Sequence, residues 1–249
     1  MKTGVKLFIT AFFITIFCIL GKSQSISLGY GPIYTHTNQK VKMVHSEEDF
    51  QNTDDQITIH YEHFIKNSGL SILGSYSTFD GHTWIKFREG SVIAPDGFPV
   101  IGDGFSGTTL HRFDFGVAYN IIPPKYSFYL KPILLAGIQK SIRKDVEIYS
   151  EIFEIYGPEY VQSEFVTAEH FNTTQIVPSL GIKTGVVLWK RIELGLTVQG
   201  VLGFKSYQNM YFKYSYKGVP QETAVFEAKG TGIYTALSIG YRFVRLSKQ

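Results

Sequence analysis

The segment from Gly230 to Phe243, GTGIYTALSIGYRF, most constrains the fold because its side chains alternate in kind. Successive side chains of a β-strand point to opposite faces, so the segment divides into two rows. The mainly apolar row is Ile233, Thr235, Leu237, Ile239, Tyr241 and Phe243, and the mostly small or polar row is Gly232, Tyr234, Ala236, Ser238, Gly240 and Arg242. Water-facing rows of soluble sheets usually carry larger polar side chains, whereas small residues suit a narrow interior. The pattern is typical of a transmembrane barrel strand, apolar towards lipid and polar towards the lumen.

Seven further stretches show a similar alternation, and about 9–11 residues let a tilted strand cross the hydrocarbon core. They are 26–37, 56–66, 70–79, 109–121, 128–140, 174–188 and 192–206. The connections 67–69, 123–127 and 189–191 are short, whereas 38–55, 80–108, 141–173 and 207–229 are long. The sequence therefore predicts an all-β fold, an antiparallel up-and-down transmembrane β-barrel of eight strands. Short periplasmic turns and both chain ends lie on one side, and long extracellular loops lie on the other.

The N-terminus has the order of a secretory signal peptide. Lys2 and Lys6 precede an apolar run from Leu7 to Leu20, and small or polar residues follow. The run is short for a membrane-spanning helix, which needs about 20 residues. We expect residues 1–24 to be a cleaved signal and residues 25–249 to form one barrel domain. The only cysteine, Cys18, lies inside the signal, so the mature chain has none.

Charge is divided between the long connections and the remainder. Without its signal the chain has 21 basic and 21 acidic side chains, so no excess of positive charge indicates nucleic-acid binding. The four long connections hold 8 basic and 18 acidic residues when Arg143 is counted with the strand before it. Either these connections are simply solvated, or they lie above an anionic lipid surface bridged by divalent ions.

Two features complicate an eight-stranded barrel. The stretch 145–169 has both helical and strand-like spacing, and we favour a hairpin above the membrane; inside the bilayer it would raise the strand count to ten. Pro32, Pro132 and Pro178 fall within predicted strands of a barrel that has no free edge. They are therefore expected at bulges or near strand ends.

Several charged residues have inward parity, and we expect them to form a polar network in the lumen. They are Glu62, Arg112, Asp114, Lys183, Glu193, Lys205 and Arg242. Charges inside a narrow barrel must pair or stay hydrated. Eight strands leave an interior that side chains just fill, so a structural plug is favoured over a pore lining. Aromatic residues near predicted strand ends are expected to form interfacial girdles: Tyr30, Tyr34, Tyr61, Tyr119, Tyr126, Trp189, Tyr207 and Tyr241.

Motifs that could carry chemistry are weak, and we predict no catalytic, cofactor or metal site. Gly102 to Gly107 matches a dinucleotide fingerprint, but a strand follows it where a helix would be needed. His60 and His63 resemble a metal pair, yet residues three apart on a strand face opposite sides. His111 has outward parity near Ser106 and Thr108, which leaves a lipid A-modifying enzyme as a third hypothesis.

The chain resembles small bacterial outer-membrane β-barrel proteins of the OmpA/OmpX-like or "porin family" type. The resemblance rests on the strand pattern over about 25–243 and on the final strand, where Tyr241 and Phe243 resemble the C-terminal signal read by the barrel-assembly machinery. VRLSKQ follows Phe243, whereas the family's signal is terminal. The resemblance implies a monomer in the outer membrane with lipids and lipopolysaccharide as partners and a non-enzymatic role in the envelope. The competing hypothesis is a secreted lipocalin-like barrel, in which the apolar rows would line a ligand cavity.

Overall fold

The computed structural model describes residues 24–43, 49–65, 68–86, 102–122, 126–149 and 161–243, and every regular element among them is a strand. The strands are β1 Gln24–Val41, β2 Asp49–Phe64, β3 Leu70–Lys86, β4 Gly102–Tyr119, β5 Phe128–Ser141, β6 Val146–Tyr149, β7 Val161–His170, β8 Thr174–Leu188, β9 Ile192–Val201, β10 Gln208–Tyr216, β11 Val219–Pro220 and β12 Ala224–Arg242. No helix long and apolar enough to span a membrane occurs in these ranges. The predicted signal, apart from its last residue, lies outside them.

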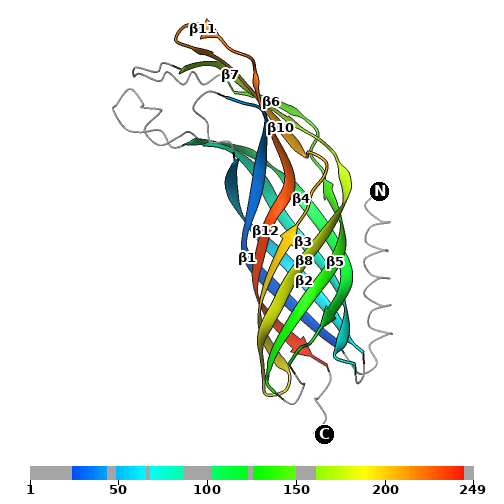
Figure 1. The fold of residues 1–249 in the computed structure, drawn as a ribbon. Helices are drawn as coiled ribbons and strands as arrows, with labels where there is room; N and C mark the ends of the chain where they lie inside the picture. The colour runs from blue at the N-terminus through cyan, green and yellow to red at the C-terminus, as the bar shows by residue number, and fades with distance from the viewer. Residues whose placement is uncertain are drawn as a thin grey trace.

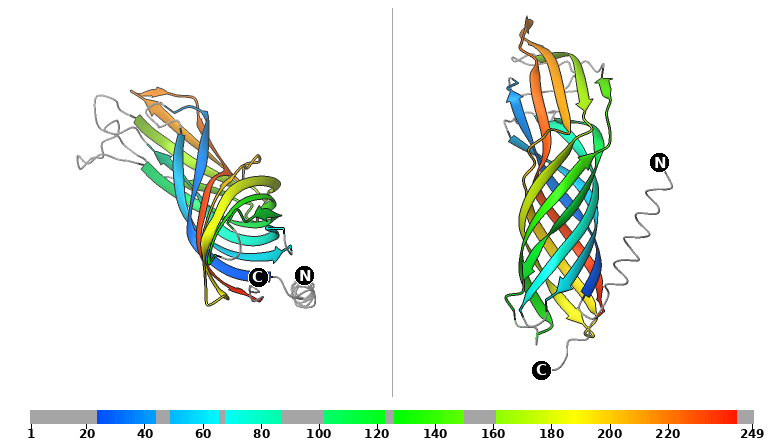
Figure 2. Two further views of the ribbon diagram at one scale, coloured as in Figure 1. Left: turned by 60° about the horizontal axis from the view of Figure 1, so that its bottom comes forward. Right: turned by 90° about the vertical axis from the view of Figure 1, so that its right-hand side faces the viewer.

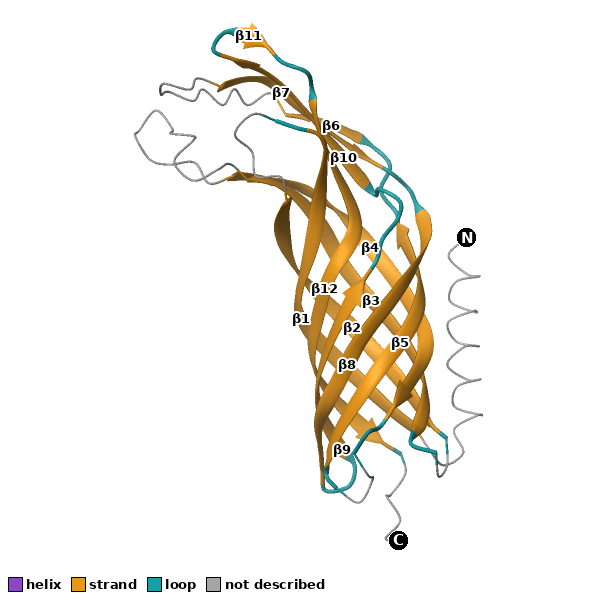
Figure 3. Ribbon diagram, in the orientation of Figure 1, coloured by secondary structure: helices purple, strands orange, loops and turns teal. Residues whose placement is uncertain are grey.

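Eight of the strands close a barrel. They pair antiparallel in the order β1-β2-β3-β4-β5-β8-β9-β12, and β12 pairs with β1 to complete the wall (Figures 1 and 3). We call the end where β1 begins and β12 finishes the turn end, and the opposite end the loop end. At the turn end, Trp189 and Lys190 both have positive φ, and the Arg191 amide bonds the Leu188 carbonyl. This is the type I′ geometry that suits a two-residue hairpin.

The apolar rows face outward. Phe115 is 67% exposed and Leu237 is 70% exposed, whereas the neighbouring Ser238 is only 7% exposed. Leu196 is also exposed, and Gly116 and Gly195 are half-buried on the opposite row. A lipocalin-like barrel would require the reverse, because its apolar side chains would line the cavity. The observed orientation is that of a barrel with lipid around it.

Pro132 and Pro178 lie inside β5 and β8 and within the unbroken β5–β8 ladder, so they are not at strand ends, but each lies where the ladder on the other side of its strand ends. The β4–β5 ladder finishes at Ile133, so Pro132 lies just beyond its last pair. The β8–β9 ladder begins at Ser179, and Pro178 is the residue before it. The Pro132 ring therefore displaces no ladder hydrogen bond to β4, and the Pro178 ring displaces none to β9.

Pro32 departs from the prediction, because it lies inside β1 without a bulge. The β1–β12 ladder stops at the pair Tyr30–Leu237 and resumes at Ile33–Tyr234 in the same register. The Gln56 side-chain amide donates to the Thr235 carbonyl at 2.9 Å, and the Thr235 hydroxyl donates to the Pro32 carbonyl at 2.7 Å. Side chains thus replace the ladder bonds that proline, which has no N–H, cannot make.

The predicted long loops contain more β-structure than the sequence indicated. β3 and β4 continue as a hairpin to the pair Lys86–Gly102, and β2 reaches back to Asp49. β6 and β7 form the predicted hairpin, with Ile148 opposite Thr167. Because β7 pairs next with β10 instead of entering the wall, the count is eight and the ten-strand alternative is wrong.

These elements form a second sheet above the barrel, which we call the loop-end sheet: β6, β7, β10 and the upper parts of β12 and β1 (Figure 2). β12 serves both sheets, pairing with β10 over residues 224–228 and with β9 over residues 232–241. Gly230 lies between these regions with a φ of 78°, where the register with β1 also shifts. A side chain at this φ would be strained, and glycine allows the strand to change partners.

Candidate functional site

A layer of buried charges crosses the lumen at its turn end. Glu62 on β2 accepts hydrogen bonds from Lys131 Nζ on β5 at 2.6 Å and Lys183 Nζ on β8 at 3.3 Å. Lys183 Nζ also lies 3.1 Å from Glu193 on β9, and Glu193 in turn accepts from Arg242 Nε on β12 at 2.9 Å. We call these five residues the charge layer. It links five strands around the wall.

Aromatic faces complete this layer, which holds three cations and two anions. Lys131 Nζ lies 4.7 Å from the ring centre of Tyr129 and 4.8 Å from that of Phe64, and Arg242 covers the same two rings at 5.5 and 5.1 Å. A ring face attracts cations, so the two rings help to accommodate the extra positive charge. Gly185 and Gly195 are cross-strand partners, and a Cβ on either would lie 2.5 Å from the Tyr129 hydroxyl oxygen. Their lack of a side chain makes room for this ring.

A second buried ion pair lies further along the lumen. Arg112 Nε donates to Asp114 Oδ2 at 3.0 Å, and the Ser75 hydroxyl donates to the same carboxylate oxygen at 3.1 Å. The Arg112 guanidinium also covers the Tyr234 ring at 4.3 Å. Arg112 and Asp114 come from one strand at spacing two, so they lie on the same face and can pair.

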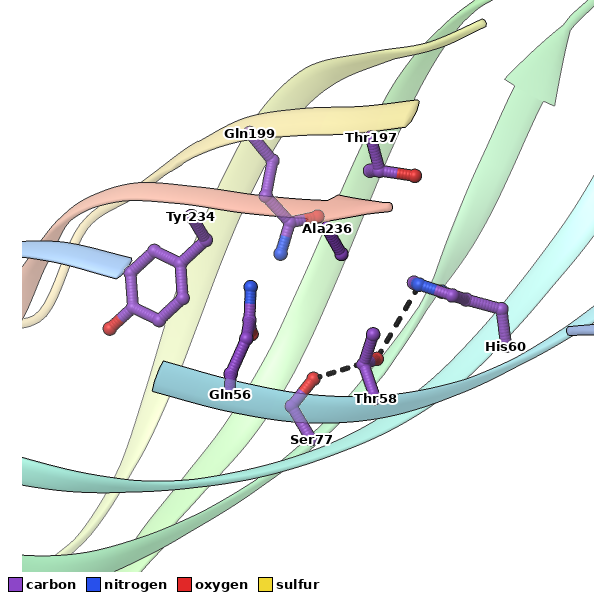
Figure 4. A pocket seen from close by; sticks show the side chains of 8 residues that line it. All are labelled: Gln56, Thr58, His60, Ser77, Thr197, Gln199, Tyr234 and Ala236. Atoms are coloured by element: carbon purple, nitrogen blue, oxygen red, sulfur yellow. Dashed lines mark hydrogen bonds between the residues drawn. The ribbon is translucent and has the colours of Figure 1, made fainter. Parts of the chain in front are cut away.

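A small polar space separates the charge layer from the upper lumen. It is lined by Gln56, Thr58, His60, Ser77, Thr197, Gln199, Tyr234 and Ala236 (Figure 4). It has room for about one water molecule. The Ser77 hydroxyl donates to Thr58 Oγ1 at 3.0 Å, and Thr58 Oγ1 lies 3.4 Å from His60 Nε2. The space is too small for an organic ligand.

Apolar and aromatic side chains fill the lumen at its loop end, and we call them the apolar layer. It consists of Ile33, Phe79, Leu110, Val177, Val201, Tyr207, Ala228 and Tyr234. Phe79 and Tyr234 pack edge to face, with ring centres 5.4 Å apart. The Tyr234 hydroxyl donates to the Gly230 carbonyl at 2.9 Å, which ties this layer to the turning point of β12. Side chains therefore fill the lumen at successive levels from one end to the other.

Two side-chain bridges join strands above the barrel where ladders end. The His82 imidazole and amide both bond the Asp54 carboxylate, just beyond the last β2–β3 pair at Gln56–Phe79. The hydrogen bond to Asp54 raises the pKa of His82. Thr108 Oγ1 on β4 lies 2.6 Å from Nδ1 of buried His170 on β7, and burial lowers the pKa of His170. These bridges hold the extended strands together without backbone pairing.

Six of the seven charges predicted for the lumen are buried there: Glu62, Arg112, Asp114, Lys183, Glu193 and Arg242. Lys205 does not join them and is exposed, because β9 ends at Val201 and strand parity no longer applies. Sequence reasoning missed Lys131. Its row also contains Ile133 and Leu135, so the strand looked apolar on both faces; its parity with Gln139 was the available signal.

The predicted aromatic girdle is also corrected at one position. Tyr119, Tyr126 and Trp189 are exposed near the turn end, and Tyr30 and Tyr34 are exposed along β1. Tyr207 instead lies fully buried in the apolar layer, because the segment after β9 leads it inside. Tyr241 and Phe243 lie at the turn end with ring centres 5.3 Å apart.

The weak motifs acquire no chemical partners among the described residues. His60 faces the lumen and His63 lies on the opposite face, and no cluster in the described ranges has enough ligands for a metal ion. Gly102–Gly107 belongs to β4 itself and opens no helix. His111 Nδ1 lies 2.7 Å from the Tyr76 hydroxyl, and Thr108 turns inward to His170. The side chain of Ser106 lies outside the described residues.

Comparisons with known proteins find similar solved structures only. No protein-family model and no curated protein matches the chain. The outer membrane protein OprG from Pseudomonas aeruginosa is 8% identical with a TM-score of 0.48, over 90% of this chain and 97% of that one. Neisserial surface protein A, NspA, is 8% identical with a TM-score of 0.38 over the same shares. The outer membrane protease OmpT from Escherichia coli is 12% identical with a TM-score of 0.41, over 89% of this chain and 97% of that one.

These identities and TM-scores are low, so the assignment of the fold rests on the closed barrel itself. The wall is a closed barrel of eight strands, so it leaves no unpaired strand edge in the lipid. Its exterior is apolar and its charges lie inside, as a bilayer requires. The chain has the fold of an outer-membrane β-barrel protein. Its fold is that of the small OmpA/OmpX-like barrels named by the sequence pattern. Its lumen has the charge layer at one end and the apolar layer at the other.

Proposed function

We propose that the protein is a non-enzymatic component of the outer membrane whose lumen is closed by side chains. The charge layer carries this proposal, because its ion pairs connect β2, β5, β8, β9 and β12 across the interior. Opening a passage would separate buried charges from their partners, which costs several kcal/mol. The apolar layer blocks the same axis a second time. A protein that does not conduct would have a structural role in the envelope, and its loop-end sheet would lie at the cell surface.

The first experiment tests whether the folded barrel conducts. The purified chain should show heat-modifiable migration on a gel, because a folded barrel resists denaturation until heated. In planar bilayers it should give no regular single-channel steps. A porin measured in the same bilayers is the positive control for conduction. Regular steps from the unaltered protein would overturn the closed-lumen proposal.

A second experiment addresses catalysis. Cells that express the chain should yield lipid A with an unchanged mass spectrum, because the His111 ring bonds Tyr76 and Thr108 points inward. A modified lipid A that disappears with His111→Ala would establish the enzymatic alternative. The variant His63→Ala, on another outward position, is the matched control.

Export and assembly belong to the same proposal. Residues 1–24 act as the cleaved signal, and the final strand with Tyr241 and Phe243 is read by the barrel-assembly machinery. The mature protein is a monomer surrounded by outer-membrane lipids and lipopolysaccharide. Intact-mass measurement of protein from the outer membrane should give the mass of a chain that starts at Ser25.

A further inference from the structure

One row of paired residues on neighbouring strands marks the upper boundary of the apolar exterior, at the loop end. On β5 the outward row runs from Phe128 through Leu134 to Ile138 and then changes to Lys140. Ten residues at about 3.3 Å each, tilted by about 40°, span about 25 Å, which is the height of the apolar band of such barrels. Lys140 therefore lies where acyl chains give way to headgroups.

The strand register extends this boundary along neighbouring strands. Thr78 pairs with His111, His111 pairs with Lys140, and Lys140 pairs with Thr174. Directly below the last pair, Ile138 lies opposite Ile176, and these side chains are 54% and 69% exposed. The cationic residue Lys140 thus lies immediately above an exposed apolar pair, Ile138 and Ile176.

A second lysine converges on the same point from another segment. Lys205, which follows β9, donates from Nζ to the Thr174 carbonyl at 3.5 Å. Cross-strand partners have Cβ atoms about 5 Å apart, so Lys140 and Lys205 flank one residue. Neither lysine forms an ion pair with an acid in the part of the chain that the structure describes. Phe204, beside Lys205 in the sequence, is also exposed.

We propose that Lys140, Thr174 and Lys205 bind a phosphate of lipid A in the outer leaflet, while Ile138, Ile176 and Phe204 contact its acyl chains. The inference rests on the proposed function, because it requires the loop end to face outward. Two lysines that flank Thr174 match a phosphate monoester, which carries up to two charges, better than the singly charged phosphodiester of a phospholipid. Lysine binds phosphate as a compact point charge and needs no rigid geometry.

The test measures lipid binding to the full mature chain in detergent by native mass spectrometry. The probes are lipid A with two phosphates, lipid A with its phosphates removed, and phosphatidylglycerol. The paired variant Lys140→Gln with Lys205→Gln should bind bisphosphorylated lipid A about 25-fold more weakly, since each basic residue near an anionic headgroup contributes roughly fivefold. The control Lys190→Asn removes an exposed lysine at the turn end and keeps a residue that tolerates positive φ. It should bind as the unaltered protein does.

The outcomes separate this site from the closed-lumen proposal. Equal binding of bisphosphorylated lipid A by the paired variant, or equal binding of lipid A without phosphates, would overturn the site. Phosphatidylglycerol binding that falls to the same degree would replace lipid A with a general anionic lipid and would also overturn it. Both lysines are exposed, so the paired variant should keep heat-modifiable migration. Conductance by the unaltered protein would refute the closed lumen and leave the lipid result standing.

Discussion

The two ends of the lumen are filled by opposite chemistry. At the turn end, five charged side chains from five strands are held by ion pairs and aromatic faces. At the loop end, apolar and aromatic side chains pack directly against one another. The charge layer depends on every member having a partner, because an orphaned buried charge is costly. The apolar layer depends on volume, because a missing side chain leaves a cavity. One barrel therefore uses pairing at one end and packing at the other.

The charge layer should be the more sensitive of the two. Glu62→Gln removes the carboxylate that both Lys131 and Lys183 contact, leaving their charges buried. We expect the free energy of unfolding to fall by about 3–5 kcal/mol, measured by urea titration in lipid vesicles. Adding Lys131→Met removes one orphaned charge and should recover part of the loss. A single variant as stable as the unaltered protein would contradict the view that pairing holds this end.

The apolar layer should respond to lost volume. Leu110→Ala removes a fully buried side chain and should lower the free energy of unfolding by about 3 kcal/mol in the same titration. Leu134→Ala, on the exposed outward row of β5, creates no internal cavity and is the matched control. If the two variants lose equal stability, the loop end is not held by close packing.

The boundary between the layers contains the side-chain substitute for a ladder bond. Gln56→Leu leaves the Thr235 carbonyl without its donor opposite Pro32 and should lower stability by about 2 kcal/mol. Pro32→Ala in that background restores a backbone N–H at this point and should recover most of the loss. Absence of recovery would mean that Gln56 acts through the polar space it lines and not through the ladder.

The smallest effect is expected above the barrel, at the bridge between Asp54 and His82. Because the pKa of His82 is raised, the bridge stabilises fully below its unfolded pKa of about 6.5 and is lost as pH rises through the raised value. The side chain is 41% exposed, so the effect is below about 0.5 kcal/mol. The protection of amides 80–82 from hydrogen exchange, taken relative to the intrinsic exchange rate at each pH, should fall at higher pH, and Asp54→Asn should abolish that change in protection. Unchanged pH dependence in the variant would exclude this bridge as its source.

The contrast also explains what the sequence could predict. Alternation locates all eight wall strands and the inward parity of residues such as Glu62 and Glu193, because one face of each strand meets lipid. It does not predict partners: Lys131 meets Glu62 only through the register that closure imposes. Above the membrane neither face meets lipid, so the alternation weakens. The extensions of β3 and β4 and the strand β10 lie in segments predicted as loops, and only the β6–β7 hairpin of the loop-end sheet was predicted. The end of β9 at Val201 was missed for the same reason, which misplaced Lys205.

The seam between β1 and β12 has a consequence for how the chain reaches this state. Ile33 pairs with Tyr234, so closure joins segments about 200 residues apart. Contacts between residues so far apart in the sequence form slowly, because the chain loses conformational entropy before these contacts contribute any stabilisation. Until the last strand is synthesised, the first has an open edge able to pair with another chain. Closure of this wall therefore has to wait until β12 has been synthesised, and protection of the two open edges during that interval is a requirement of its topology.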